Sequence, residues 1–235
     1  MNNLNFVLTL FTAALLIGCE TTSQLNKSAQ EQASVSLAFK SFADGAVRVV
    51  TDNGKNVLTG TLIKAQTGYY LLSSMHGFNT LQQDIVLKQG ANSLSAKLGV
   101  VITIPKTDVV VAKLLPEANL DFESQLFSST PVEVFKKQHG QLVLSQLLYC
   151  FSMFEQPSGV VVSILEQRHI AALTSQITGI VTQEPSAPSK SGGICTTSSG
   201  EVVGLTKGNL IGKDPFTVGV IEQLEGGLAS LISRL

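Results

Sequence analysis

The sequence has no excess of basic residues, and this limits the partners that the protein can have. Its 235 residues carry 16 lysines and arginines against 17 aspartates and glutamates, spread along the chain. A protein that binds nucleic acid neutralises phosphates with a cluster or stripe of basic side chains. We therefore expect no nucleic-acid partner. The ordinary hydrophobic content and low net charge describe a globular protein that can bury a core.

Histidine and cysteine are also scarce, which argues against a metal centre. The only histidines besides His76 are His139 and His169, and both follow polar or charged residues that favour a surface position. No Cys-x-x-Cys pair is present, so the sequence offers no ligand set for zinc. We predict neither a metal nor another cofactor.

An apolar run at the N-terminus, from Leu4 to Ile17, is too short to cross a membrane as a helix. It is typical of an export signal, although the three residues that begin the chain include no lysine or arginine. The tetrapeptide Leu16-Ile17-Gly18-Cys19 resembles the lipobox of bacterial lipoproteins. The resemblance implies a signal peptide over residues 1–18, cleavage before Cys19 and acylation of its thiol.

Acylated Cys19 would anchor the protein in a membrane, because more than one acyl chain gives stable attachment. Glu20 is not the aspartate that retains lipoproteins at the inner membrane in many enteric bacteria. We therefore expect a lipid-anchored protein of the outer membrane that faces the periplasm, with residues 19–45 as lipidated cysteine and polar tether. The alternative is a plain secretory peptide with an incidental cysteine. A short helix over Gln30–Phe42 fits the end of the tether.

From Ala46 onward, no long amphipathic helix separates the apolar segments, which disfavours a parallel α/β sheet. Short segments with strand propensity follow one another instead, separated by turn residues. The predicted strands of the first half are Val47–Thr51, Val57–Ala65, Tyr69–Ser74, Asp84–Gln89, Ser93–Ile104 and Asp108–Leu115. Those of the second half are Val132–Phe135, Leu142–Leu147, Gly159–Leu165, Gln176–Thr182, Gly193–Thr197, Glu201–Thr206 and Phe216–Ile221.

Pro116–Pro131 has little periodicity and is predicted to connect the two all-β halves. The segment 222–235 places leucines and an isoleucine at helical spacing, despite Gly226-Gly227, and is predicted to be a C-terminal helix.

The segment Pro188-Ser189-Lys190-Ser191-Gly192-Gly193 is a small-residue turn with a hydroxyl near its centre, set between two predicted strands. A serine hydroxyl becomes a nucleophile when a base takes its proton, and backbone amides beside glycines can surround a developing oxyanion. His76, at the end of Tyr70-Leu71-Leu72-Ser73-Ser74-Met75-His76, is the candidate base. Asp108, which opens Asp108-Val109-Val110-Val111, is the candidate acid.

The order His, Asp, Ser across two all-β halves resembles the chymotrypsin-fold serine proteases. The likeness is closest to the short bacterial trypsin-like peptidases and to the protease domain of the periplasmic high-temperature-requirement family, and it covers about residues 46–221. It implies an all-β protein with two six-stranded antiparallel barrels, over 46–120 and 131–221, followed by the C-terminal helix. The implied activity is that of a serine endopeptidase acting on a protein or peptide substrate.

In this resemblance, His76 accepts the proton of Ser191, and Asp108 orients the imidazole. The backbone amides of Ser189 and Ser191 form the oxyanion hole. Pro185 takes the position at the base of the primary specificity pocket and Thr206 lies in its wall, which favours a small or medium apolar substrate side chain. The sequence does not indicate an oligomeric state.

Two residues depart from the family pattern. Ser189 stands where the family has glycine, whose freedom at φ turns an amide towards the oxyanion. Lys190 replaces an aspartate or asparagine, and a lysine cannot form the carboxylate-to-terminus ion pair of trypsin-type activation. These departures keep one alternative open, a protease-fold binding module of the envelope without turnover. An esterase-like hydrolase that uses the same triad is a further alternative, because fold analogy alone does not exclude it.

Cys150 and Cys195 remain after Cys19. An exported protein meets an oxidising compartment, where two thiols can pair. The sequence leaves open whether they form a disulfide or are two small buried apolar side chains.

Overall fold

A computed structural model of the chain describes residues 31–51, 54, 56–78, 84–104, 106–116, 127–135, 141–174, 179–186, 189–211 and 217–223. The chain divides into two compact units, Met1–Ala38 and Phe39–Leu235. Residues 31–38 of the first unit are helical. The expected signal peptide and Cys19 lie outside the described residues.

The first barrel consists of six antiparallel strands. They are β1 (Ala46–Thr51), β2 (Asn56–Ala65), β3 (Gly68–Ser74), β4 (Asp84–Gln89), β5 (Asn92–Thr103) and β6 (Val109–Pro116). Their order is β1-β4-β5-β6-β3-β2, and the pairing of β1 with β2 closes the sheet. Alternate side chains such as Val47, Val49 and Leu71 fill the interior and are fully buried. The six strands predicted for this half are confirmed, with shifts of one or two residues at their ends.

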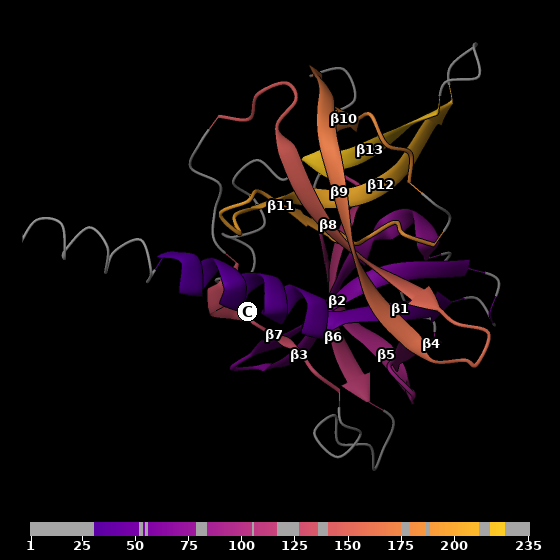
Figure 1. The fold of residues 1–235 in the computed structure, drawn as a ribbon. Coiled ribbons are helices and arrows are strands. Elements are labelled where there is room, and N and C mark those ends of the chain that lie inside the picture. Colours follow the sequence, from indigo (N-terminus) through magenta and orange to yellow (C-terminus); the bar gives the residue numbers. More distant parts are fainter. Residues whose placement is uncertain are drawn as a thin grey trace, which may run out of the picture. The chain divides into compact units, whose positions relative to one another are not determined.

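The second barrel is also closed, in the order β10-β13-β12-β11-β8-β9. Its strands are β8 (Leu147–Glu155), β9 (Val161–Thr174), β10 (Gly179–Thr182), β11 (Ile194–Thr196), β12 (Val202–Ile211) and β13 (Thr217–Gln223). Leu148, Ile170 and Ile180 are in its core. The predicted architecture of two six-stranded antiparallel barrels is therefore confirmed (Figure 1).

Three predictions for the second half are wrong in detail. Val132–Phe135 is not a strand, because Val132–Val134 form the 3-10 helix η3 after the two-residue strand β7 (Thr130–Pro131), which pairs with β2. Of the predicted strand Leu142–Leu147, only Leu147 is in a strand, as the first residue of β8. Val143 and Leu144 are both exposed, and the positive φ of Ser145 turns the chain.

The strand β8 begins only at the last residue of this segment, and its successive residues from Cys150 to Met153 are all buried. Burial on both faces removes the alternation that marks a strand in a sequence. At the C-terminus, Glu222 and Gln223 belong to β13 and not to a helix. The rest of the expected C-terminal helix lies outside the described residues.

Helical structure continues through residues 39–45 and ends where β1 begins. Phe39 lies 5.2 Å from Tyr149, centroid to centroid, and Phe42 lies 5.4 Å from Phe135 and 5.8 Å from Phe151. These aromatic side chains pack on β8 and so join residues 39–45 to the compact unit that begins at Phe39. In the part of the chain that the structure describes, no helix is long and apolar enough to cross a membrane.

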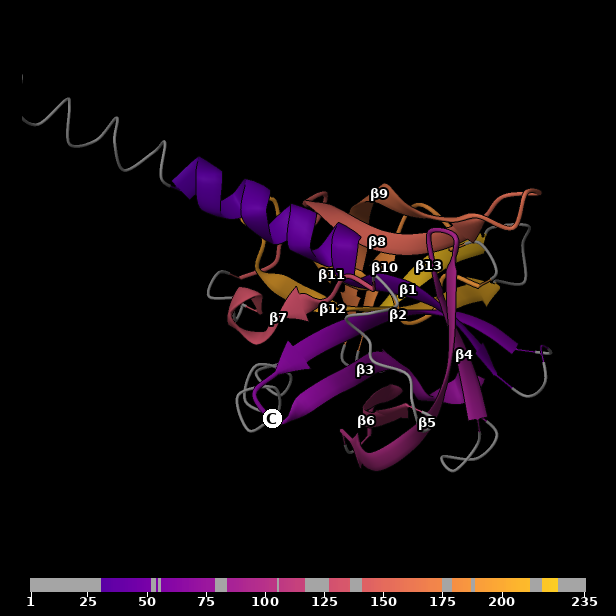
Figure 2. The same cartoon turned by 90° about the horizontal axis from the view of Figure 1, so that it is seen from below.

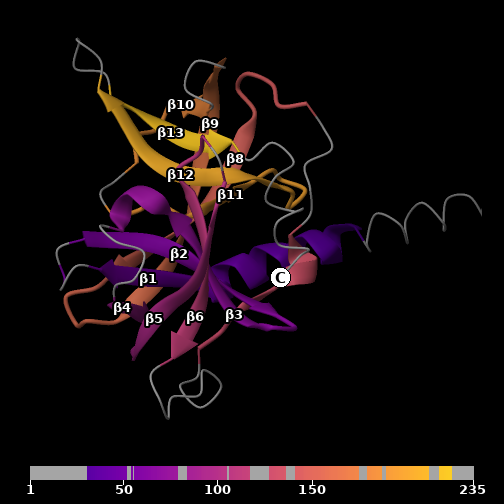
Figure 3. The same ribbon diagram turned by 180° about the vertical axis from the view of Figure 1, so that it is seen from behind.

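The two barrels lie side by side, as the opposite views of Figures 1 and 3 show. Ala46 of the first barrel packs with Met153 and Val161 of the second, and Figure 2 shows β8 passing close to β1. The Thr59 hydroxyl, in β2, accepts a hydrogen bond of 3.1 Å from the Met153 amide. Contacts between the barrels therefore fix where the loops at their junction lie.

Cys150 and Cys195 form a disulfide in the core of the second barrel. They are directly paired residues of the neighbouring strands β8 and β11. The alternative of two unpaired thiols is therefore wrong.

Candidate active site

His76 and Asp108 lie at the same end of two paired strands. His76 is in the 3-10 helix η2 (Met75–Gly77), which directly follows β3, and Asp108 directly precedes β6. Since β3 and β6 run antiparallel with Ser74 opposite Val109, the end of one strand meets the start of the other. The sheet register therefore brings together two residues that are distant in the sequence.

The Asp108 carboxylate binds His76 through both of its oxygens. Oδ2 lies 2.5 Å from His76 Nδ1, and Oδ1 accepts a hydrogen bond of 2.8 Å from the His76 amide. The Asp108 carbonyl accepts a further bond of 2.8 Å from the Met75 amide. A carboxylate at Nδ1 favours the tautomer with its proton on Nδ1, which leaves Nε2 as a proton acceptor. The His76 side chain is 47% exposed, so substrate can reach it.

Ser191 is held by backbone contacts to both barrels. Its carbonyl accepts a hydrogen bond of 2.9 Å from the Thr59 amide of the first barrel. In the second barrel, the Gly192 amide donates to the Thr206 carbonyl at 2.7 Å. Gly192 has a φ of 92°, and a Cβ there would lie 2.2 Å from the Thr59 carbonyl oxygen. Only glycine therefore fits between Ser191 and the first barrel.

The Ser191 hydroxyl donates a hydrogen bond of 3.0 Å to the Lys207 carbonyl. Lys207 lies at a register shift in β12, between Thr206 and Gly208, where the regular pairing with β13 is interrupted. Such an irregularity re-aims backbone groups, here towards the nucleophile candidate.

His76 and Ser191 line one open pocket of about 390 Å³. Asn56, Val57, Leu58, Gly77 and Ser189 line the rest of it. The structure thus brings the base and the nucleophile that the sequence predicts to a common space.

Ser189 adopts the conformation that glycine would favour. Its φ is 70°, in the left-handed region, and its carbonyl accepts a hydrogen bond of 3.1 Å from the Thr59 hydroxyl. A non-glycine residue in this region is uncommon and costs about 1–2 kcal/mol, so the surrounding contacts must hold it there. Ser189 therefore has a left-handed φ although it is not a glycine, and the oxyanion hole stays a prediction.

No protein-family model matches the chain, and no curated protein matches it. Several solved structures do. A serine endoprotease from Yersinia pestis has a TM-score of 0.57 and 16% identity over 85% of this chain, which spans 65% of that protein's length. The MamO protease domain from Magnetospirillum magneticum has a TM-score of 0.57 and 15% identity, with 84% of this chain and 98% of that chain covered. The chain has the trypsin-like serine protease fold.

A catalytically active tobacco etch virus protease complexed with product has the same architecture. Its TM-score is 0.60 at 10% identity, over 82% of this chain and 78% of that chain. At such identities the likeness establishes the trypsin-like fold and leaves the activity of this chain to be argued from its own residues.

Neither Pro185 nor Thr206 is among the described residues that line the pocket beside His76. Pro185 is exposed, whereas Thr206 is 1% exposed and its hydroxyl lies 3.5 Å from the Cys195 sulfur, inside the second barrel. The Thr206 side chain therefore does not form an open pocket wall. The preference for an apolar substrate side chain stays a prediction.

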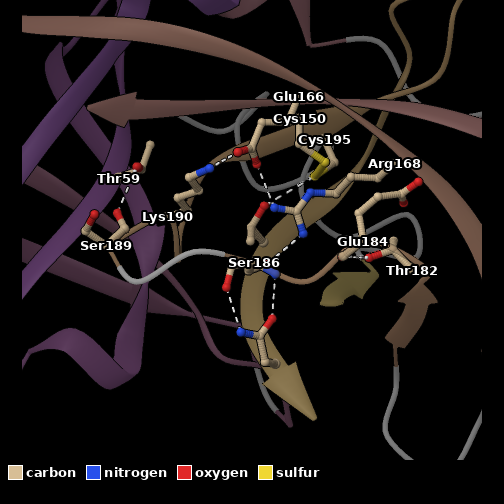
Figure 4. Close-up of polar contacts among 12 residues, drawn as sticks. Thr59, Cys150, Glu166, Arg168, Thr182, Glu184, Ser186, Ser189, Lys190 and Cys195 are labelled. Carbon is tan, nitrogen blue, oxygen red and sulfur yellow. Dashed lines mark hydrogen bonds and ion pairs between the residues drawn. A yellow bond between two sulfur atoms is a disulfide. The ribbon is translucent and has the colours of Figure 1, made fainter. Parts of the chain in front are cut away.

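Sequence reasoning missed a polar cluster beside the nucleophile loop, shown in Figure 4. Glu166 of β9 forms ion pairs with Lys190 and Arg168, and the buried Arg168 also donates to the Ser186 hydroxyl at 2.6 Å. Alternating charged residues on β9 are the only sequence signal, and they look like an exposed strand face.

Glu184 and His169 form a second pair near this cluster. The Glu184 carboxylate accepts hydrogen bonds of 2.8 Å from both the backbone and Nδ1 of His169. Burial raises the pKa of Glu184, but the bonds from His169 outweigh it and the pKa lies below its ordinary value. In the ranges that the structure describes, no three histidine, cysteine or acidic side chains lie close enough to hold a metal ion.

Proposed function

We propose that this protein is a serine endopeptidase, exported and lipid-anchored in the bacterial envelope, that cleaves peptide bonds through an acyl-enzyme. The observation that carries the proposal is the shared pocket of His76 and Ser191, with Asp108 bound to the far side of the imidazole. A hydroxyl beside an imidazole that a carboxylate orients is the arrangement that activates serine for acyl transfer.

In this mechanism, the Ser191 hydroxyl turns from the Lys207 carbonyl towards His76 Nε2. Oγ attacks the carbonyl carbon of the substrate, and its proton passes to Nε2. The tetrahedral intermediate then collapses, the C–N bond breaks, and His76 returns the proton to the leaving amine. A water molecule then gives a proton to His76 and attacks the acyl carbon, the bond between that carbon and Ser191 Oγ breaks, and His76 returns the proton to Oγ. Asp108 stabilises the imidazolium while it exists.

The backbone amides of Ser189 and Ser191 would stabilise the oxyanion. The left-handed φ of Ser189 supports this role, because it is the conformation that glycine would supply. Removal of one such donor typically costs about 2.7–4 kcal/mol of transition-state stabilisation.

A fluorophosphonate probe tests the proposal, since it reacts with an activated serine. We expect covalent labelling of the wild type, and none of Ser191→Ala or His76→Ala. Thr196→Ala, a fully buried hydroxyl in the same barrel, is the control and should label like the wild type. If the folded wild type stays unlabelled, the proposed peptidase activity is wrong.

The second candidate function is a protease-fold binding module without turnover. The hydrogen bond of the Ser191 hydroxyl to the Lys207 carbonyl favours it, because that bond uses the hydroxyl proton that the base would have to accept. A folded but unreactive wild type that still binds peptide would support this function over catalysis.

The lipid anchor has a separate test. If Cys19 is acylated, Cys19→Ala should move the protein from the membrane fraction to the soluble fraction. Thr196→Ala should not, because Thr196 lies in the second barrel and takes no part in the disulfide. Retention of the Cys19 variant in the membrane would contradict the anchor.

A further inference from the structure

Lys190, the residue directly before the nucleophile candidate, forms an ion pair across the second barrel. Its Nζ contacts Oε1 of Glu166 in β9, and both side chains are only 18% exposed. Desolvation lowers the pKa of Lys190. A lysine that is largely removed from water needs a fixed anionic partner, so this contact differs from a solvated surface pair.

Glu166 is itself held in place by a second cation. Its Oε2 accepts a hydrogen bond of 2.7 Å from Nη2 of Arg168, whose side chain is 1% exposed. Nη1 of Arg168 donates to the Ser186 hydroxyl at 2.6 Å. Burial lowers the pKa of Arg168, and the Glu184 carboxylate opposes this effect. Because the buried guanidinium requires its acceptors, Glu166 is a rigid partner for Lys190.

Ser186 belongs to the segment that leads into the nucleophile loop, and it is fixed as well. Its backbone amide donates to the Asn209 side-chain oxygen Oδ1 at 2.5 Å, and its carbonyl accepts from the Asn209 side-chain nitrogen Nδ2 at 2.6 Å. Figure 4 shows Glu166 between Lys190 and Arg168, with Arg168 directed at Ser186. The chain of contacts therefore holds residues on both sides of the turn that precedes Ser191.

The backbone at Ser189 is strained, so contacts with the rest of the protein must hold it in place. Its left-handed φ of 70° has no glycine to relieve it. The Thr59 hydroxyl binds the Ser189 carbonyl from the first barrel, and Glu166 binds the Lys190 side chain from the second. These two contacts hold the peptide group between Ser189 and Lys190 and the Lys190 side chain, and the backbone dihedral angles on either side of that peptide group set where the amides of Ser189 and Ser191 point.

We propose that the ion chain Arg168–Glu166–Lys190 is a positioning device that keeps the oxyanion loop in its strained conformation. In the ion pair of trypsin-type activation, the residue before the serine supplies a carboxylate to a chain terminus. Here the charges are reversed, because the loop supplies the cation Lys190 and the barrel supplies the carboxylate of Glu166. The loop is thus held by residues within the domain. The catalytic part of this inference rests on the proposed peptidase function, and the structural part does not.

The test removes the cation of Lys190 and compares it with a matched ion pair elsewhere. Lys190→Met and Lys190→Gln break the contact with Glu166, whereas Lys190→Arg keeps it. Lys88→Met is the control, because Lys88 binds Glu155 at 2.9 Å and Glu155 also binds Arg48 at 3.0 Å. Each carboxylate is thus shared by one lysine and one arginine, but only Glu166 is tied to the nucleophile loop.

The first readout is hydrogen exchange of the Ser189–Gly193 backbone, which needs no activity. We expect exchange about tenfold faster in Lys190→Met and Lys190→Gln than in the wild type, and wild-type exchange in Lys190→Arg and Lys88→Met. Unchanged exchange in both neutral variants would overturn the proposal, whatever the activity.

The second readout is the rate of fluorophosphonate labelling, with kcat and KM once a substrate is known. Lys190→Met should lower the labelling rate and kcat about 10- to 100-fold, with KM changed less than about twofold, because a misaimed oxyanion donor weakens only the transition state. Lys190→Arg should restore most of the rate. If the wild type is unreactive while loop exchange still depends on Lys190, the peptidase function fails and the positioning device stands.

Discussion

Gly192 offers the sharpest test of how the nucleophile loop fits between the barrels. Alanine at this position meets two costs. A φ of 92° is unfavourable for any residue with a Cβ, by about 1–2 kcal/mol. The new Cβ would also lie 2.2 Å from the Thr59 carbonyl oxygen, 2.5 Å from the Ser73 hydroxyl and 2.9 Å from the Ser74 amide. Ser73 can rotate, but the backbone groups cannot yield without moving β2 or β3.

Overpacking of this kind typically costs about 1–3 kcal/mol, so Gly192→Ala should lower the free energy of unfolding by about 2–5 kcal/mol in total. Gly159→Ala separates the two costs, because Gly159 has a similar φ of 82° and a Cβ there meets nothing within 4 Å. Its free energy of unfolding should fall only by the cost of the positive φ, about 1–2 kcal/mol.

Urea unfolding of both variants measures the difference, provided that the m-value stays constant. Gly192→Ala should also reduce fluorophosphonate labelling at least about 100-fold, since a displacement near 1 Å is enough for such a loss. Equal destabilisation of the two variants would refute the reasoning, because it would mean that the loop has room beside Thr59. Labelling of Gly192→Ala at the wild-type rate would refute the link between this fit and reactivity.

Three further predictions concern the triad, the disulfide and an ion pair between the barrels. Asp108→Asn should lower kcat or the labelling rate by about 10⁴-fold, because His76 loses the acceptor that sets its tautomer; a loss below tenfold would contradict the role. Cys150→Ser opens a cross-link with a sequence separation of 45, which the chain-entropy relation places at about 4 kcal/mol of stability. Urea unfolding of this variant and of the reduced wild type should agree, and a cost near zero would contradict the estimate from chain entropy. The hydrogen bond from Lys88 lowers the pKa of Glu155, so its stabilisation is present above the pKa of the unfolded state and is lost as the pH falls through the lower folded pKa. The difference in Tm between the wild type and Glu155→Gln should therefore be present at neutral pH and shrink as the pH falls below the pKa of an unfolded glutamate, and a difference independent of pH would exclude the ion pair as its cause.

The fold could be predicted where the sequence pattern is local. Alternating apolar residues and turn signals located the six strands of the first barrel, because one face of each strand is buried and the other is not. The same reasoning failed at β8, where helical aromatic residues cover the outer face and burial becomes continuous from Cys150 to Met153. The pattern also predicted that Glu222 begins a helix, whereas Glu222 lies near the end of β13 and is only 1% exposed.

The candidate site divides in the same way. His76, Asp108 and Ser191 could be proposed from residue type and order, by resemblance to a known arrangement. The partner of Lys190 could not, because Glu166 lies on a different strand and meets it only through the closure of the second barrel. Thr206 is a related case: its position in the sequence suggested a pocket wall, but the inward face of β12 places its hydroxyl beside Cys195.

The sequence by itself determined the β class, the two halves, and the types and order of the three residues proposed for catalysis, because these depend on local patterns and on motifs within short segments. Only the tertiary structure decided that Asp108 reaches His76, that Cys150 bonds to Cys195, and that the Ser191 hydroxyl donates to the Lys207 carbonyl. Each of these contacts joins residues that are distant along the chain. Their geometry is set by strand register and barrel closure, which no local pattern encodes.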